Sequence, residues 1–191
     1  DPRTGALSGL YVSDDTSMNW ILRPDGTQYE WVDSRYGWGL GSLCVNGTVY
    51  SWDTPVALHA EDNRMDVKYQ AGDIEINVFR IWNEDGNLIE SYEFVNTGNE
   101  AAGLHDIAVN TPFNDNYPDA RTCIDARCNA HIWAGGNDSY VYCTRMSGAP
   151  GGLGLILKEG AVNGYQVCGR SEKTGGSNFR GVIRLEPEDR M

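Results

Sequence analysis

Basic residues are scarce in this sequence. Its 191 residues include 15 Lys and Arg against 27 Asp and Glu, which gives a formal net charge of −12 at pH 7. Binding to nucleic acid or to an anionic membrane surface draws its affinity from clustered Lys and Arg. The charge therefore argues against nucleic acid and membranes as partners.

Long hydrophobic runs and histidines are also missing. No apolar run approaches the roughly 20 residues that a helix needs to cross a bilayer. Only three histidines are present, too few for histidine-rich zinc chemistry. A nucleophile elbow, a phosphate-binding loop and a zinc-binding His pair are absent as well. We therefore expect no cofactor, no metal and no catalytic residue in this chain.

Two weaker catalytic patterns are present. With 27 acidic residues, some pair of carboxylates can always be posited as a glycosidase site, so this signal has little specificity. His105 and Asp106 are adjacent in a run that reads as a strand, where neighbouring side chains point to opposite faces. That alternation argues against a His-Asp dyad.

Glycines and turn signals, by contrast, are frequent. The chain has 23 glycines, and turn sequences such as Pro24-Asp25-Gly26, Asn46-Gly47 and Asp85-Gly86 separate short runs rich in β-branched and aromatic residues. Asn46-Gly47 is the strongest hairpin signal, because both residues tolerate the positive φ of a type I′ turn. These features predict an antiparallel all-β domain.

About ten to fourteen strands are expected, and that number in one domain implies two packed sheets. The predicted fold is an antiparallel two-sheet β-sandwich of the supersandwich type, formed by residues 1–191 as a single domain. One short helix or structured loop is expected near 119–129. The expected strands include 5–12, 64–69, 73–82, 88–95, 104–109, 140–145, 153–157 and 179–185.

Five cysteines cannot all pair. The spacing of Cys123 and Cys128 fits a small disulfide loop, half of a metal site or two thiols on a short helix. Cys44, Cys143 and Cys168 lie in strand-like runs, where a free Cys behaves as a small buried hydrophobe. The odd number favours a reducing compartment, such as the bacterial cytoplasm, over secretion.

The densest cluster of polar loop residues begins at Asn110. Within it, Asn114, Asp115, Asn116 and Asp119 carry oxygen ligands of the kind that bind calcium, although the Gly and the terminal Glu of the EF-hand pattern are missing. The alternative is a rigid loop whose Asn and Asp side chains satisfy backbone donors beside two prolines.

The same region is a candidate sugar-binding site. Aromatic rings stack on the apolar faces of sugars, while amides, carboxylates and guanidinium groups bind hydroxyls. The substrate-binding candidates are Asn114, Asp115, Tyr117, Arg127, His131 and Trp133. For the other tryptophans, burial in the core is the favoured interpretation. These are Trp20, Trp31, Trp38, Trp52 and Trp82.

Several motifs resemble those of a known group of proteins. They are the run from Leu88 to Trp133, which includes Asn-Thr-Pro-Phe-Asn-Asp-Asn-Tyr-Pro-Asp and Arg-Cys-Asn-Ala-His-Ile-Trp, together with Met18-Asn19-Trp20 and Tyr36-Gly37-Trp38-Gly39. The chain resembles the N-terminal galactose-mutarotase-like β-supersandwich of multi-domain glycoside hydrolases, which precedes an α/α-barrel catalytic domain. The resemblance implies that the catalytic carboxylates lie on that helical barrel.

The favoured function is a non-catalytic β-sandwich domain of a bacterial glycoside hydrolase or related polysaccharide-degrading enzyme. Its expected partners are carbohydrate and a helical catalytic domain, in the same polypeptide or a partner chain. The sequence stops where a turn would lead to another strand, which suggests a piece of a longer polypeptide, although a natural terminus fits as well. The alternatives are a free-standing carbohydrate-binding module and a sugar epimerase or glycosidase in its own right.

Overall fold

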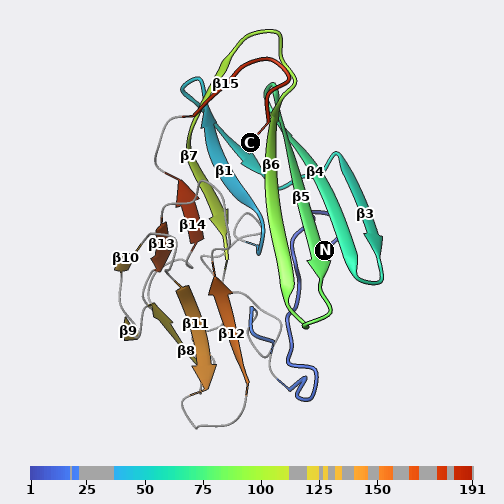
Figure 1. Ribbon diagram of the computed structural model, residues 1–191, viewed down its shortest axis with the longest axis vertical. Coiled ribbons are helices and arrows are strands. Elements are labelled where there is room, and N and C mark those ends of the chain that lie inside the picture. The colour runs from blue at the N-terminus through green and yellow to red at the C-terminus, as the bar shows by residue number, and fades with distance from the viewer. Residues whose placement is uncertain are drawn as a thin grey trace. The chain divides into compact units, whose positions relative to one another are not determined.

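The structure of the chain is a computed structural model, shown in Figure 1. It describes residues 1–17, 19–21, 37–111, 120–124, 127–128, 132–134, 140–145, 151–156, 164–167, 176–179 and 183–190. Every regular element in this described part is a β-strand, which confirms the all-β prediction. The chain separates into two compact units. Unit 1 comprises 1–6, 39–107 and 180–191, and unit 2 comprises 7–38 and 108–179.

A four-stranded antiparallel sheet forms the larger part of unit 1 (Figure 1). Its strands follow one another along the chain as hairpins, in the order β3 (Ala57–Glu61), β4 (Arg64–Ala71), β5 (Ile74–Trp82) and β6 (Leu88–Asn96). The strands predicted at 64–69, 73–82 and 88–95 are therefore confirmed.

One face of this sheet is buried, and alternation along β5 shows which one. Ile74, Ile76 and Val78 are fully buried, whereas Glu75 and Asn77 between them are only half-buried. Side chains on one face of a strand recur at every second residue, so this pattern marks a sheet with a core face and an outer face.

The second sheet of unit 1 contains β1 (Gly41–Val45) and β2 (Thr48–Trp52), with β1 also next to β7 (Ala102–Asn110). The short β15 (Ile183–Leu185) pairs with the beginning of β7. Asn46 and Gly47 join β1 to β2 with φ of 49° and 86°, which confirms the positive φ expected for this turn. The Asn46 side chain also accepts a hydrogen bond from the Gly103 amide of β7, at 2.8 Å.

The core of unit 1 is formed by both sheets. Leu43 and Trp52 of the second sheet and Leu104 of β7 are almost completely buried. Trp52 meets Phe94 of β6 edge to face, with ring centroids 6.0 Å apart and an interplanar angle of 71°. This contact joins the two sheets, so unit 1 has the two-sheet architecture that was predicted for the chain, whereas the prediction of a single domain over residues 1–191 stays a prediction.

Unit 2 contains a second four-stranded antiparallel sheet, in the order β12-β11-β8-β9. Its strands are β8 (Ala120–Ile124), β9 (Arg127–Cys128), β11 (Tyr140–Arg145) and β12 (Gly152–Ile156). A further antiparallel set contains β10 (Ile132–Ala134), β13 (Gly164–Val167) and β14 (Gly176–Phe179). The strands predicted at 140–145 and 153–157 are confirmed to within one residue.

Two segments differ from their expected local structure. The described residues of the segment 119–129 belong to strands β8 and β9 and not to the short helix or loop expected there, and Cys123 and Cys128 lie opposite each other across these strands. The segment 5–12 forms no strand. The carbonyls of Thr4 and Gly5 instead accept hydrogen bonds from the side chains of Tyr69 and Arg80, at 2.7 and 2.8 Å.

Burial of the tryptophans follows the expected pattern with one exception. Trp20, Trp38 and Trp52 are buried, with 2%, 4% and 1% of their surface exposed, whereas Trp31 lies outside the described residues. Trp82 contradicts the prediction because 45% of its surface is exposed. It is the last residue of β5, where the covering of the sheet ends.

Candidate functional site

The sugar-binding residues predicted from the sequence lie largely outside the described part of the chain. This holds for Asn114, Asp115, Tyr117 and His131. Of the remaining two, Arg127 lies on β9 opposite Ile124, and Trp133 lies on β10 opposite Gln166. The structure thus places these two on separate strand sets of unit 2, and their role in binding stays a prediction.

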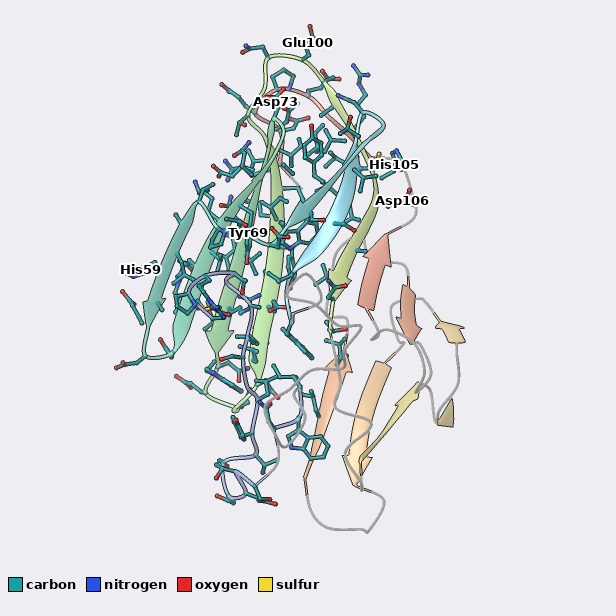
Figure 2. All side chains as sticks on the ribbon, turned by 180° about the vertical axis from the view of Figure 1, so that it is seen from behind. His59, Tyr69, Asp73, Glu100, His105 and Asp106 are labelled. Atoms are coloured by element: carbon teal, nitrogen blue, oxygen red, sulfur yellow. The ribbon has the colours of Figure 1, made fainter. Side chains whose placement is uncertain are left out.

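A His-Asp pair is the clearest polar constellation on the surface of unit 1. His105 Nδ1 lies 2.9 Å from Asp106 Oδ2, and Figure 2 shows the two labelled side chains together on one side of β7. The sequence prediction that their side chains point to opposite faces is therefore wrong. About a third of the His105 side chain is exposed, and most of the Asp106 side chain is.

A bulge in β7 brings the two side chains together. Asp106 has a φ of 51°, a left-handed conformation that Asp tolerates better than most residues. Before it, Ala102 and Leu104 are buried; after it, the buried positions are Ile107 and Val109. The burial pattern thus shifts by one residue at His105 and Asp106, which leaves both of them on the outer side.

This geometry fixes what the pair can do chemically. If the Nδ1–H group of His105 donates a hydrogen bond to the Asp106 carboxylate, Nε2 of the neutral ring is left as a proton or hydrogen-bond acceptor. Catalytic use would also require a substrate-binding cavity with further polar groups around it. In the described residues the pair stands alone on the surface of a strand, so its geometry by itself does not make an active site.

A buried charged cluster lies on the core face of unit 1. The Arg80 side chain is 2% exposed and pairs through Nε with Glu90 on the neighbouring strand, while Tyr92 also donates a hydrogen bond to Glu90. Arg80 Nη1 donates to the Gly5 carbonyl at 2.8 Å. The cluster therefore ties the N-terminal segment to the sheet.

The charges in this cluster shift the pKa values of its members. Burial alone would lower the pKa of Arg80, but the Glu90 carboxylate offsets this and holds it above its usual value. Burial raises the pKa of Tyr69 to about 12, and burial together with the nearby Glu90 raises the pKa of Tyr92 well above its usual range. At neutral pH the guanidinium of Arg80 is therefore charged and the phenols of Tyr69 and Tyr92 are neutral.

A glycine makes room for this buried guanidinium. Gly39 has a φ of 82°, and a Cβ added there would lie 1.8 Å from Arg80 Nη2. That nitrogen is buried and has no hydrogen-bond partner among the described residues. The carbonyl of Gly39 in turn accepts a hydrogen bond from Trp52 Nε1 at 3.1 Å. Because the guanidinium of Arg80 is buried among Gly5, Gly39 and Glu90, we interpret the cluster as structural.

His59, like His105, lies on the surface of unit 1. His59 Nε2 is 3.0 Å from Glu61 on the same strand, β3, and both side chains are more than 60% exposed. Figure 2 shows His59 at the outer edge of the sheet. Such exposed pairs contribute little to stability. Among the described residues, no group of three or more His, Cys, Asp or Glu side chains is placed to hold a metal ion.

Comparison with solved structures gives the most informative result. The chain matches a region of a polysaccharide lyase with a TM-score of 0.80 and 36% sequence identity, and the match covers 100% of this chain and 30% of the lyase chain. No protein-family model and no curated protein matches. Within the described residues there is also no helix long and apolar enough to span a bilayer.

The match confirms the coarser part of the sequence-based identification. The chain corresponds over its whole length to a β-sandwich region of a larger carbohydrate-active enzyme. It spans about a third of the length of that enzyme. The similar protein is a lyase, whereas the sequence motifs favoured a hydrolase.

Proposed function

We propose that this chain is a non-catalytic β-sandwich domain of a multi-domain polysaccharide lyase. The observation that carries the proposal is the full-length match at 36% identity to a region that makes up only 30% of a lyase chain. At this identity the comparison supports common descent, and the shared region is too small to be the whole enzyme. A second domain would then carry the catalytic residues.

The described residues support a non-catalytic role. The two surface pairs described for histidine, His105-Asp106 and His59-Glu61, have no third polar partner within the described part of the chain. Among the residues that the structure describes, the strongly perturbed ionisable groups lie around Arg80, which is buried against Gly5 and Gly39. Perturbed groups often mark active sites, but a sealed ion pair perturbs pKa values equally well.

The loop region from Asn114 to Trp133 is proposed to contact the glycan. In this role Tyr117, His131 and Trp133 stack on sugar rings, and Asn114, Asp115 and Arg127 bind hydroxyl groups. The helical catalytic domain expected from the sequence resemblance would provide the other side of the site. This arrangement is a proposal that rests on residue chemistry.

Calorimetric titration against a panel of acidic and neutral polysaccharides tests this assignment. For a docking domain we expect no measurable binding by residues 1–191 alone. In kinetic assays of the full polypeptide encoded by the gene, Trp133→Ala should raise KM about fivefold, which corresponds to the loss of roughly 1 kcal/mol of aromatic contact. Tyr11→Ala is the matched control, because Tyr11 is a 52% exposed aromatic residue outside both the predicted glycan-binding residues and the core face of the four-stranded sheet, and it should leave KM unchanged. Tight binding by the isolated chain that Trp133→Ala abolishes would instead identify a carbohydrate-binding module.

A further inference from the structure

The core face of the four-stranded sheet in unit 1 is not covered over its whole area. Its centre is sealed, because Val67, Tyr69 and Val78 are at most 2% exposed. Toward β3 and the end of β5 the same face opens to solvent, where Leu58 is 37% and Trp82 is 45% exposed. The residues that cover the centre therefore stop short of this corner of the sheet.

Five apolar side chains line this corner, and we call them the apolar strip. Strand register makes them contiguous: Ala60 lies opposite Met65, and Trp82 lies opposite Leu88. Met65 lies opposite Arg80, and Arg80 is two residues before Trp82 on the same face of β5. On β3, Leu58 is two residues before Ala60 and therefore shares its face. The strip thus consists of Leu58, Ala60, Met65, Trp82 and Leu88. All five are exposed or half-buried.

Acidic residues border the strip. The β3–β4 turn carries Asp62 and the β5–β6 turn carries Glu84 and Asp85, all of them exposed. The two turns lie at the same end of the sheet, because the Trp82 amide donates to the Asn63 carbonyl at 2.9 Å. None of the three carboxylates forms an ion pair with another described residue.

We propose that this domain docks through its apolar strip against another domain of its own polypeptide. The facing surface of that second domain presents apolar side chains flanked by Lys or Arg. This inference rests on the proposed function. Contiguous exposed apolar surface with a polar border is typical of an interaction site. In the similar lyase most of the chain lies outside the matched region, so such a domain has a large neighbour to contact.

The acidic border favours another domain of the polypeptide over a second copy of the chain as the partner of the strip. In a symmetric dimer the same patch meets itself, so the carboxylates of Asp62, Glu84 and Asp85 from both copies would be brought to one interface. Like charges brought together at an interface disfavour association. A chain with a net charge of −12 adds to that repulsion. A neighbouring domain with a basic border has the opposite effect.

Hydrogen–deuterium exchange on residues 1–191 and on the full polypeptide encoded by the gene tests the proposal. We expect amides of β3 and of the β5–β6 turn to exchange about tenfold more slowly in the full polypeptide. Leu58→Asp should remove this added protection. Val49→Asp is the matched control, because Val49 is a 73% exposed residue of β2 outside the strip, and it should leave the protection intact.

A charge reversal supplies an independent variant. Glu84→Lys combined with Asp85→Lys changes only exposed side chains, so it should leave the isolated chain folded while it weakens protection in the full polypeptide. Protection confined to other strands would overturn the docking surface but leave the proposed function standing. Protection of the strip in the isolated chain that rises with protein concentration would identify a second copy and overturn the proposal. A gene that encodes no further domain would overturn both.

Discussion

His105 and Asp106 are neighbours in one strand, yet their side chains lie on the same side of it and meet at 2.9 Å. The contact exists because Asp106 adopts a φ of 51° and shifts the burial pattern of β7 by one residue. A regular strand would direct one of the two side chains into the core. The bulge therefore creates a polar surface pair where alternation predicts none.

Substitutions at Asp106 test the bulge. A β-branched side chain is poorly compatible with left-handed φ, so Asp106→Val should lower the free energy of unfolding by about 1–2 kcal/mol. Asp106→Gly, which relieves the backbone, should change it by no more than about 0.5 kcal/mol. Urea unfolding of both variants provides the measurement. Equal stabilities for the Val and Gly variants would show that residue 106 does not have positive φ in solution.

The close approach of Gly39 to Arg80 predicts a second difference. Gly39→Ala and Gly47→Ala introduce the same methyl group at nearly the same φ, 82° and 86°, but only the first meets a neighbouring atom. Backbone strain should lower the free energy of unfolding of both variants by about 1 kcal/mol. Overpacking should lower that of Gly39→Ala by about 1–3 kcal/mol more. Thermal unfolding of the pair measures the difference, and equal losses would contradict the buried position of Arg80.

The Arg80-Glu90 pair predicts a large effect of removing one partner. Glu90→Gln leaves a buried guanidinium without its counter-charge, which should destabilise the chain by about 3–5 kcal/mol. Arg80→Met combined with Glu90→Gln removes the buried charge as well and should recover part of that loss. A double-mutant cycle by urea unfolding measures the coupling, and additive effects of the two changes would show that the pair is not formed.

Tyr69 predicts a loss of stability at alkaline pH. Its folded-state pKa of about 12 lies above the ordinary value of 10, so between these values the unfolded chain releases the phenolic proton and the folded chain keeps it. The contribution of Tyr69 to the free energy of unfolding is therefore fully present below pH 10. It falls as pH rises toward 12, by on the order of 2–3 kcal/mol. Unfolding free energies across this range for the wild type and Tyr69→Phe measure the effect. The Phe variant should lose less, and an identical slope would contradict the assignment.

Strand positions could be predicted from the sequence because they depend on local patterns. Turn signals at Asn46-Gly47 and Asp85-Gly86 mark two hairpins that the structure confirms, and alternation along β5 identifies its buried face. The same alternation places Arg80 on that apolar face. The Asp85-Gly86 turn then aligns Arg80 with Glu90, so hairpin register was a signal from which the buried ion pair could have been found.

Other features depend on contacts that no local pattern encodes. The segment 5–12 has strand-like composition, but the carbonyl of Gly5, its first residue, accepts a hydrogen bond from the distant side chain of Arg80, and the preceding Thr4 carbonyl accepts one from Tyr69. The bulge at Asp106 has no signature in the sequence, because Asp is only one of several residues that tolerate positive φ. The exposure of Trp82 could not be predicted either, because composition favours burial of any tryptophan. Whether Trp82 is buried depends on how far the core face of its sheet is covered.

The most direct test of a non-catalytic lyase domain is turnover by residues 1–191 alone. Lyases cleave by elimination, so each cut leaves a double bond that absorbs ultraviolet light. The isolated chain and the full polypeptide should be assayed at equal molar concentration on a panel of acidic polysaccharides, with His105→Ala prepared in both. We predict that the full polypeptide forms unsaturated product and that the isolated chain forms none. Product formation by residues 1–191 that His105→Ala abolishes would contradict the account, because the catalytic residues would then lie in this chain.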